Sequence, residues 1–164
     1  MGKINCCVLV FAGLLWAIPI WAASSEEDLR RLDLNRGIVG VVGIDEDDSS
    51  YLIDLCEQSE LTIYFQTDDP SFAATVRQAA SVRGILGRRL FVQSGSLASI
   101  HLGDNVADRI LVAESAKDHV SRAEVMRALR PRGIGWIADE SMTKPVPDGV
   151  DDWSHPYHEI GRAH

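Results

Sequence analysis

The chain has 164 residues, of which 46% are hydrophobic and 24% charged, and its formal net charge at pH 7 is -8. A chain of this length has room for one ordinary domain, and the composition is that of a globular protein, not of a low-complexity segment. Because the chain is acidic and has no basic patch of useful size, nucleic acid is not expected as a partner.

The first 23 residues have the pattern of a secretory signal peptide. Lys3 supplies a positive start, an apolar run follows over residues 6–21, and residues 22–24 form a small-residue cleavage zone. An uncleaved membrane anchor is the alternative, but Pro19 and the small residues behind it favour cleavage. We therefore predict a secreted or periplasmic protein without a membrane contact after cleavage. The mature chain would carry a charge of -9, because residues 1–23 hold one lysine.

Strand-like and helix-like segments alternate along the next part of the chain. Short runs rich in β-branched and aromatic residues indicate strands, and apolar residues on one face indicate helices. Asp69 and Pro70 form a typical helix start, since Asp caps free backbone N–H groups and Pro is favoured at the first helical position. We expect a leading helix over residues 25–34, a strand over 38–44, a helix capped by Ser49 or Ser50 and reaching about 58, a strand over 61–65, and a helix over 69–82 that ends at Gly84.

The second part of the chain continues the alternation, with strands expected over residues 89–93, 108–113 and 134–138 and a helix over 120–129 that ends before Pro131. This order predicts an α/β fold, a doubly wound parallel sheet with helices on both faces. Right-handed crossovers then place the strands in the order 3-2-1-4-5, with the third and fifth at the edges.

From Glu140 onward the alternation stops, and we expect a domain over residues 24–140 followed by a connector over 141–164. No further strand is predicted, so the fifth strand would leave an edge uncovered and the connector would pack poorly, with Trp153 either covering that edge or awaiting a partner. His155 and His158 are spaced three apart, but Pro156 argues against a helix between them. Packing or docking is therefore expected there, and no metal site is predicted.

The cysteine and histidine residues between the signal peptide and the connector do not indicate a catalytic or metal site. Cys56 would be the one cysteine left after signal cleavage, and it lies on an apolar helix face, as a buried small hydrophobe does. His119 is expected at the surface near a helix start. No Ser-His-Asp or Cys-His arrangement suggests a nucleophile, so no catalytic residue is predicted.

The stretch from residue 37 to 48 is the best candidate for a binding site. It is a β-rich apolar run that ends at Gly43 and is followed by four acidic residues. In an open α/β sheet a nucleotide-type ligand sits at such a turn, where glycines allow a close backbone approach. Asp45 and Asp47 stand where the next glycines would be expected, so the turn is predicted to be poorly suited to such a ligand.

Two segments resemble class I S-adenosylmethionine-dependent methyltransferases. Residues 104–112 read DNVADRILV, similar to the family's approach to strand four, and residues 124–133 read EVMRALRPRG, similar to its helix and turn before strand five. The resemblance covers about residues 37–138 and implies a Rossmann-like, methyltransferase-like sheet that here lacks the family's final strands. The second motif is scaffold and carries no statement about activity.

The tail resembles a narrower group. Residues 152–159, DWSHPYHE, are similar to a D-x-W-[ST]-H-x-x-H segment of secreted bacterial proteins in which a methyltransferase-like domain precedes a β-propeller with pyrroloquinoline-quinone (PQQ)-type repeats. This resemblance implies a downstream β-propeller domain as the partner and makes the chain the N-terminal piece of a longer protein.

The methyltransferase resemblance also implies where a cofactor would be bound. Gly43 matches the turn that holds the methionine part of the cofactor, whereas Asp45 lies in that turn in place of a glycine. Gln66 or Thr67, with Asp68 one step further on, matches the acid that binds the ribose hydroxyls. Ser96 replaces the acid near the adenine. The implied cofactor-binding positions are Gly43, Asp45, Gln66, Asp68, Ser96 and Glu114.

Three functions remain open. The first is a secreted methyltransferase-like domain with a degenerate cofactor site and no bound cofactor, acting as a structural or interaction module. The second is an active methyltransferase that uses S-adenosylmethionine through an atypical turn. The third is a binder of another small molecule in the same crevice. The acidic turn and the predicted export favour the first, because S-adenosylmethionine is a cytosolic metabolite.

Overall fold

The structure, a computed structural model, describes residues 20–44 and 49–147, with side chains from residue 25 onward. Its helices are α1 (Ile20–Leu32), α2 (Ser50–Glu57), α3 (Pro70–Val82) and α4 (Arg122–Ala128), with a short 3₁₀ helix η1 (Glu114–Ala116). Its strands are β1 (Arg36–Val42), β2 (Glu60–Thr67), β3 (Leu90–Ser94), β4 (Ala107–Val112), β5 (Leu129–Ile137) and β6 (Glu140–Thr143).

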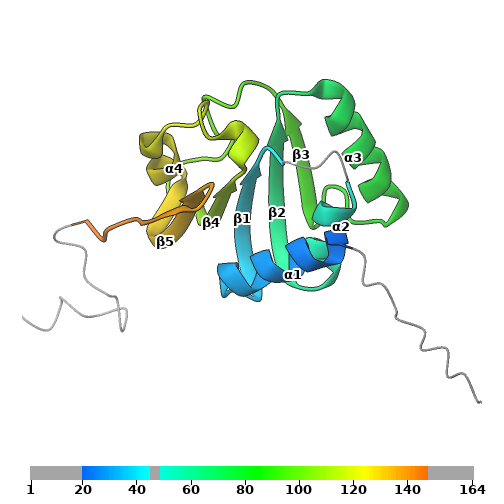
Figure 1. Cartoon of the computed structure of the whole chain (residues 1–164), viewed down its shortest axis with the longest axis horizontal. Coiled ribbons are helices and arrows are strands. Elements are labelled where there is room, and N and C mark those ends of the chain that lie inside the picture. Colours follow the sequence, from blue (N-terminus) through cyan, green and yellow to red (C-terminus); the bar gives the residue numbers. More distant parts are fainter. Residues whose placement is uncertain (1–19, 45–48, 148–164) are drawn as a thin grey trace, which may run out of the picture.

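These strands form one sheet in the order β3-β2-β1-β4-β5-β6 (Figure 1). The first five are parallel, and β6 runs antiparallel to β5. The predicted α/β class and the order 3-2-1-4-5 are therefore confirmed. Strand β1 lies in the interior of the sheet, as right-handed crossovers in both directions from it require.

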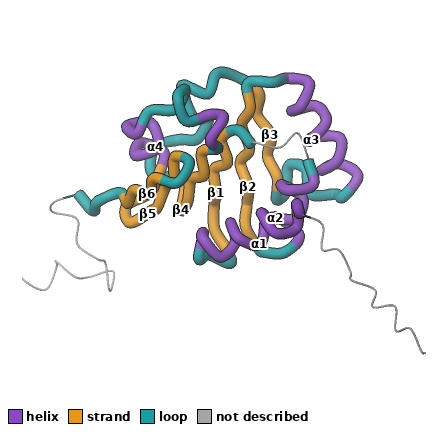
Figure 2. Tube along the Cα trace, viewed as in Figure 1, coloured by secondary structure: helices purple, strands orange, loops and turns teal. Residues whose placement is uncertain are grey.

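The sheet separates two hydrophobic cores, because alternate side chains of each strand point to opposite faces. Val39 and Val41 of β1 belong to the core that α1, α2 and α3 cover. Val42 and Ile110 belong to the core on the other face, under α4 and the loop of residues 95–106. This loop takes the place of a helix between β3 and β4 (Figure 2).

Local capping signals place two helix starts correctly. The Asp69 side chain accepts a hydrogen bond from the Ser71 N–H at 2.7 Å at the start of α3. The Ser121 hydroxyl accepts one from the Glu124 N–H at 3.1 Å at the start of α4. Of the two predicted caps of α2, Ser49 occupies the N-cap position, but its side chain makes no capping hydrogen bond. The leading helix begins at Ile20, earlier than predicted.

Strand β6 corrects the expectation that the fifth strand is an edge and that the chain leaves the domain at residue 141. Residues Ala138 and Asp139 make a two-residue turn, after which Glu140–Thr143 pairs with Ile134–Ile137. Met142 is buried in the core under α4. The strand was missed because it is short and polar and because Ala138, with a φ of +50°, stands where a glycine would normally announce the turn.

The junction between α4 and β5 also differs from the prediction. The strand begins at Leu129, immediately after the helix, and runs through Pro131 instead of starting at residue 134. Pro131 disfavours a helical conformation at Arg130, so the chain extends at once and Leu129 pairs with Ala107 of β4. A register shift between β4 and β5 accommodates the early start.

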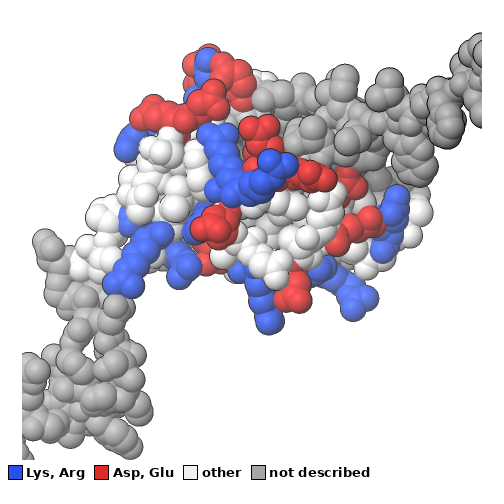
Figure 3. Space-filling model, turned by 60° about the horizontal axis from the view of Figure 1, so that its bottom comes forward, with Lys and Arg blue, Asp and Glu red and all other residues white. Residues whose placement is uncertain are grey.

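The remaining sequence predictions concern burial, charge and the termini. Cys56 is buried and His119 is exposed, as predicted. Acidic and basic side chains are interspersed on the face drawn in Figure 3. Among the described residues no helix is both long and apolar enough to span a membrane. The predictions for residues 1–19 and for Trp153, His155 and His158 lie outside the described residues.

Candidate functional site

The turn after β1 has the geometry that a glycine requires. Gly43 has a φ of +68°, in the left-handed region that favours glycine, and its N–H donates to the Gln66 carbonyl at 2.8 Å. A Cβ at this position would lie 2.9 Å from the Cβ of Ala116. The structural need for Gly43 is thus confirmed, while a role in cofactor binding stays a prediction. Asp45 and Asp47 fall outside the described residues.

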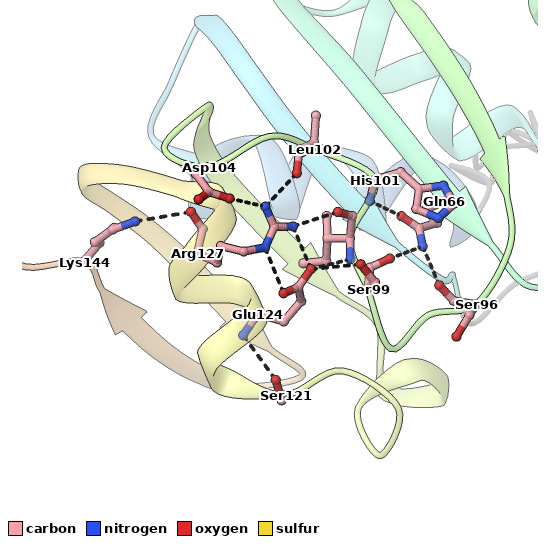
Figure 4. Close-up of polar contacts among 11 residues, drawn as sticks. Gln66, Ser96, Ser99, His101, Leu102, Asp104, Ser121, Glu124, Arg127 and Lys144 are labelled. Carbon is pink, nitrogen blue, oxygen red and sulfur yellow. Dashed lines mark hydrogen bonds and ion pairs between the residues drawn. The ribbon is translucent and has the colours of Figure 1, made fainter.

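Gln66, the residue at the predicted ribose position, lies at the carboxyl end of β2 with 3% of its surface exposed. Its amide nitrogen donates to the carbonyls of Ser96 and Ser99, both at 2.8 Å, and its amide oxygen accepts from the His101 N–H at 2.8 Å (Figure 4). Both amide protons are therefore engaged by the loop of residues 95–106. In this conformation the Gln66 side chain fixes a loop of the same chain.

The same loop is fastened from its other side by α4 (Figure 4). The Glu124 carboxylate accepts from the Ile100 N–H at 2.8 Å, and Arg127 donates to the Ile100 and Leu102 carbonyls, both at 2.9 Å. Arg127 also pairs with Glu124 at 2.7 Å and with Asp104 at 2.6 Å. Hydrogen bonds from Arg127 hold the pKa of Glu124 below its usual range, with burial opposing them. Gln66 of β2 and the two α4 residues Glu124 and Arg127 therefore hold the loop of residues 95–106 from two sides.

The other predicted site residues are exposed and scattered. Asp68 lies in the bend after β2 and is exposed. Ser96 is exposed, and its hydroxyl accepts from the Ala98 N–H at 3.3 Å. Glu114 opens η1 and pairs with Lys117. The structure thus joins Gly43, Gln66 and Ser96 by hydrogen bonds and leaves Asp68 and Glu114 outside that network.

A cavity of about 460 Å³ opens beside Gly43, on the face of the sheet that α1 covers. We call it the α1 cavity. It is lined by the carboxyl ends of β1, β4 and β5, by α1 and by α2. Glu114 lines it as well, while its role in cofactor binding stays a prediction. Besides Asp139 in the turn after β5, the lining includes four polar or aromatic residues on α1, α2 and β5 that no sequence motif indicated: Asp28, Arg31, Tyr51 and Trp136.

These four residues form two pairs across the α1 cavity. The Tyr51 hydroxyl donates to Asp28 Oδ2 at 2.6 Å. Arg31 donates to the Ala138 carbonyl at 2.9 Å, and its guanidinium carbon lies 5.3 Å from the centroid of the Trp136 ring. Burial raises the pKa of Asp28, although the Tyr51 hydrogen bond and the Arg31 charge oppose the effect. No local sequence signal could have found these pairs, since Arg31 and Ala138 are 107 residues apart.

Metal binding finds no support in the part of the chain that the structure describes, where no group of three or more His, Cys, Asp or Glu side chains could hold an ion. The described residues of the site offer hydrogen bonding, charge and apolar contact. That Gly43 and Gln66 would hold a cofactor is implied by the sequence resemblance and stays a prediction.

The fold is that of the class I S-adenosylmethionine-dependent methyltransferases. A candidate S-adenosyl-L-methionine-dependent methyltransferase from Methanococcus maripaludis matches with a TM-score of 0.59 and 20% identity over 71% of this chain and 54% of that one. Geranyl diphosphate C-methyltransferase from Streptomyces coelicolor A3(2), in complex with Mg2+, geranyl diphosphate and S-adenosyl-L-homocysteine, matches at 0.60 and 12% identity over 70% and 42%. The [4+2]-cyclase SpnF matches at 0.57 and 19% identity over 69% and 42%.

These similarities establish a methyltransferase-like domain, and at such low identities they concern the fold alone. The chain spans roughly half the length of the first of these structures, and somewhat less of the other two. No protein-family model and no curated protein matches the sequence. The presence of a cyclase among the similar structures illustrates that this fold is compatible with more than one chemistry.

Proposed function

We propose that this chain is a methyltransferase-like domain that does not use S-adenosylmethionine and serves as a structural or interaction module of a longer, exported protein. The observation that carries the proposal is the engagement of Gln66 by the loop of residues 95–106. The position that would contact a cofactor ribose is occupied by backbone of the same chain.

Releasing Gln66 for a ligand is costly. An amide has two N–H donors, and both are used on the Ser96 and Ser99 carbonyls. Each of these bonds stabilises the fold by about 1 kcal/mol, and a carbonyl left without its donor costs more. The acidic residues Asp45 and Asp47 in the sequence after Gly43 add bulk and negative charge where the carboxylate of the cofactor would approach.

Titration calorimetry with S-adenosylmethionine tests the proposal. We expect the wild-type chain to bind with a dissociation constant weaker than about 1 mM. Gln66→Glu restores a strand-two acid and removes the donors to Ser96 and Ser99, so measurable binding by this variant would identify the loop as the obstacle. A low micromolar constant for the wild-type chain, abolished by Gly43→Arg, would overturn the proposal and make the domain an enzyme.

An active methyltransferase is the second candidate function. Its support is the left-handed backbone at Gly43 together with the α1 cavity that opens beside it. A binder of another small molecule is favoured by the same cavity, because its polar and aromatic lining comes from positions that the family motifs do not include. The titration above separates the enzyme from the other two.

Export and the β-propeller partner rest on the sequence. Residues 1–23 have the signal-peptide pattern, and residues 152–159 carry the tail motif. Cleavage after Ala23 would shorten α1, which begins at Ile20. Mass spectrometry of the exported protein is expected to find Ser24 at its N-terminus. The reading frame beyond His164 is expected to encode repeated strand-and-turn units, and a different continuation would remove the propeller from the proposal.

A further inference from the structure

The α1 cavity has the dimensions of a small-molecule site. Its volume of about 460 Å³ lies within the range of ligand pockets in proteins. It opens at the carboxyl ends of β1 and β4, next to Gly43 and Ala113. In an open α/β sheet this edge, where the strand order reverses, is where ligands bind.

One wall of the cavity is a continuous apolar row. Val41, Leu111 and Trp136 are direct neighbours on β1, β4 and β5, and all three point to the face that α1 covers. Trp136 is 8% exposed. The parts of these side chains that border the cavity offer a ligand apolar contact.

The charges around the cavity are mostly negative. Asp28, Glu114 and Asp139 line it, and Arg31 is the one basic residue among the lining residues that the structure describes. Arg31 is already engaged, since it donates to the Ala138 carbonyl at 2.9 Å and lies over the Trp136 ring. The lining therefore offers an acceptor for a cation more readily than a donor for an anion.

Asp28 is the acceptor best placed for that role. Its Oδ2 accepts the Tyr51 hydroxyl at 2.6 Å, and its Oδ1 accepts no hydrogen bond from the described residues. Burial raises the pKa of this carboxyl more than the Tyr51 hydrogen bond and the Arg31 charge lower it. The charged form of Asp28 is therefore not fully stabilised by its surroundings. A ligand ammonium would place a positive charge beside the Asp28 carboxylate and donate a charge-assisted hydrogen bond to its Oδ1.

We propose that the α1 cavity binds a small primary amine with an apolar body, its ammonium against Asp28 and its body against the row of Val41, Leu111 and Trp136. Such a ligand needs neither the loop of residues 95–106 nor Gln66. Amine binding is therefore compatible with either outcome for S-adenosylmethionine, and titration of that cofactor into a separate sample without amine reports on the proposed function.

Three probes that share a phenethyl group and differ in the charge of the attached polar group test the proposal on the full chain. Phenethylamine, 3-phenylpropionate and the neutral 3-phenylpropanamide are titrated by calorimetry. We expect the amine to bind with a dissociation constant below about 1 mM and the carboxylate at least about tenfold more weakly, with the amide between them. Equal affinities for the amine and the carboxylate, or no detectable binding of the amine, would overturn the proposal.

Matched variants locate the binding. Asp28→Asn keeps an acceptor for Tyr51 and removes the charge, so we expect it to weaken amine binding about tenfold. Glu60→Gln removes one negative charge at the opposite end of β2, away from the cavity, and is expected to leave binding unchanged. Trp136→Phe is expected to weaken all three probes alike. Thermal unfolding of each variant verifies the fold. Equal effects of Asp28→Asn and Glu60→Gln would show that only the overall charge matters and would refute the site.

Discussion

At the scale of single residues, Asp28 of α1 places a half-buried carboxylate against the Tyr51 hydroxyl of α2. Its pKa is raised above 3.8, mainly by burial, with Glu27 adding to the effect and with Tyr51 and Arg31 opposing it. A raised pKa in the folded state means that the protonated carboxyl favours folding. This contribution is complete below the unfolded-state pKa and is lost as the pH rises through the folded-state pKa.

Asp28→Asn is therefore expected to raise the free energy of unfolding at about pH 7, where the wild-type carboxylate is charged in both states. The asparagine keeps an oxygen for the Tyr51 hydroxyl and carries no charge to bury. The difference from wild type is expected to shrink as the pH falls towards about 4, because Asp28 itself then becomes neutral. Urea denaturation at the two pH values measures this, with Glu60→Gln as the control. A gain that does not vary with pH would contradict the assignment.

Gln66 uses its side-chain amide to hold a loop of its own chain. It lies where the sequence comparison puts the ribose-binding position, yet its amide satisfies backbone groups of Ser96, Ser99 and His101. An acid at the same position could not donate to two carbonyls. The amide at this position thus supplies the two donors that the loop carbonyls need.

At the scale of elements, Arg127 of α4 replaces the contacts that a helix between β3 and β4 would supply. Its guanidinium donates to the Ile100 and Leu102 carbonyls and pairs with Glu124 and Asp104. Leu102 in turn packs so closely on Gly40 of β1 that a Cβ there would lie 3.3 Å from its Cδ1. The loop thereby covers the sheet without regular structure of its own.

Arg127→Met keeps the aliphatic stem and removes every donor, so we expect a loss of about 2–3 kcal/mol in the free energy of unfolding. Arg83→Met is the control, since Arg83 pairs at 2.8 Å with Glu57 on the surface, both side chains about half exposed. That pair is expected to contribute less than about 1 kcal/mol. Urea denaturation gives both values, and faster amide exchange confined to residues 95–106 would mark the loop as the part released. Equal losses in the two variants would contradict the role of Arg127.

At the scale of the whole molecule, β6 completes the domain. Met142 fills the core under α4, and Lys144 bonds to the backbone of Arg132 and Gly133 at 2.9 Å and to the Asn105 side chain at 2.7 Å. Residues 140–144 thus join β5 to the turn before β4. The strand covers what would otherwise be an open edge of β5.

A chain ending at Asp139 is therefore expected to be less stable by about 3 kcal/mol or more, or to aggregate, because it loses a buried methionine and a set of strand hydrogen bonds. A chain ending at Pro147 keeps all of these contacts and is expected to unfold at the wild-type temperature. Thermal unfolding and size-exclusion chromatography compare the two. Equal stability of both truncated chains would show that β6 is dispensable.

The sequence by itself determined the class of fold, the strand order and the main helices. These features depend on signals within a few residues of each other, such as the cap at Asp69, the glycine at the turn after β1 and the apolar runs of the strands. The order of the sheet followed because the handedness of crossovers leaves few arrangements open. The two methyltransferase-like motifs, residues 104–112 and 124–133, lie in these same strands, helices and turns.

Only the tertiary structure decided where the polar side chains find partners. The bonds of Gln66 to the loop and of Arg31 to Ala138 join residues that are 30 to 107 positions apart. Strand β6 likewise exists because β5 offers it an edge and the core accepts Met142, although its own four residues have little strand character. Local propensity determines where helices and strands form. Which groups are buried and which hydrogen bonds they make is determined only when these elements pack together. The candidate site consists almost entirely of such tertiary contacts.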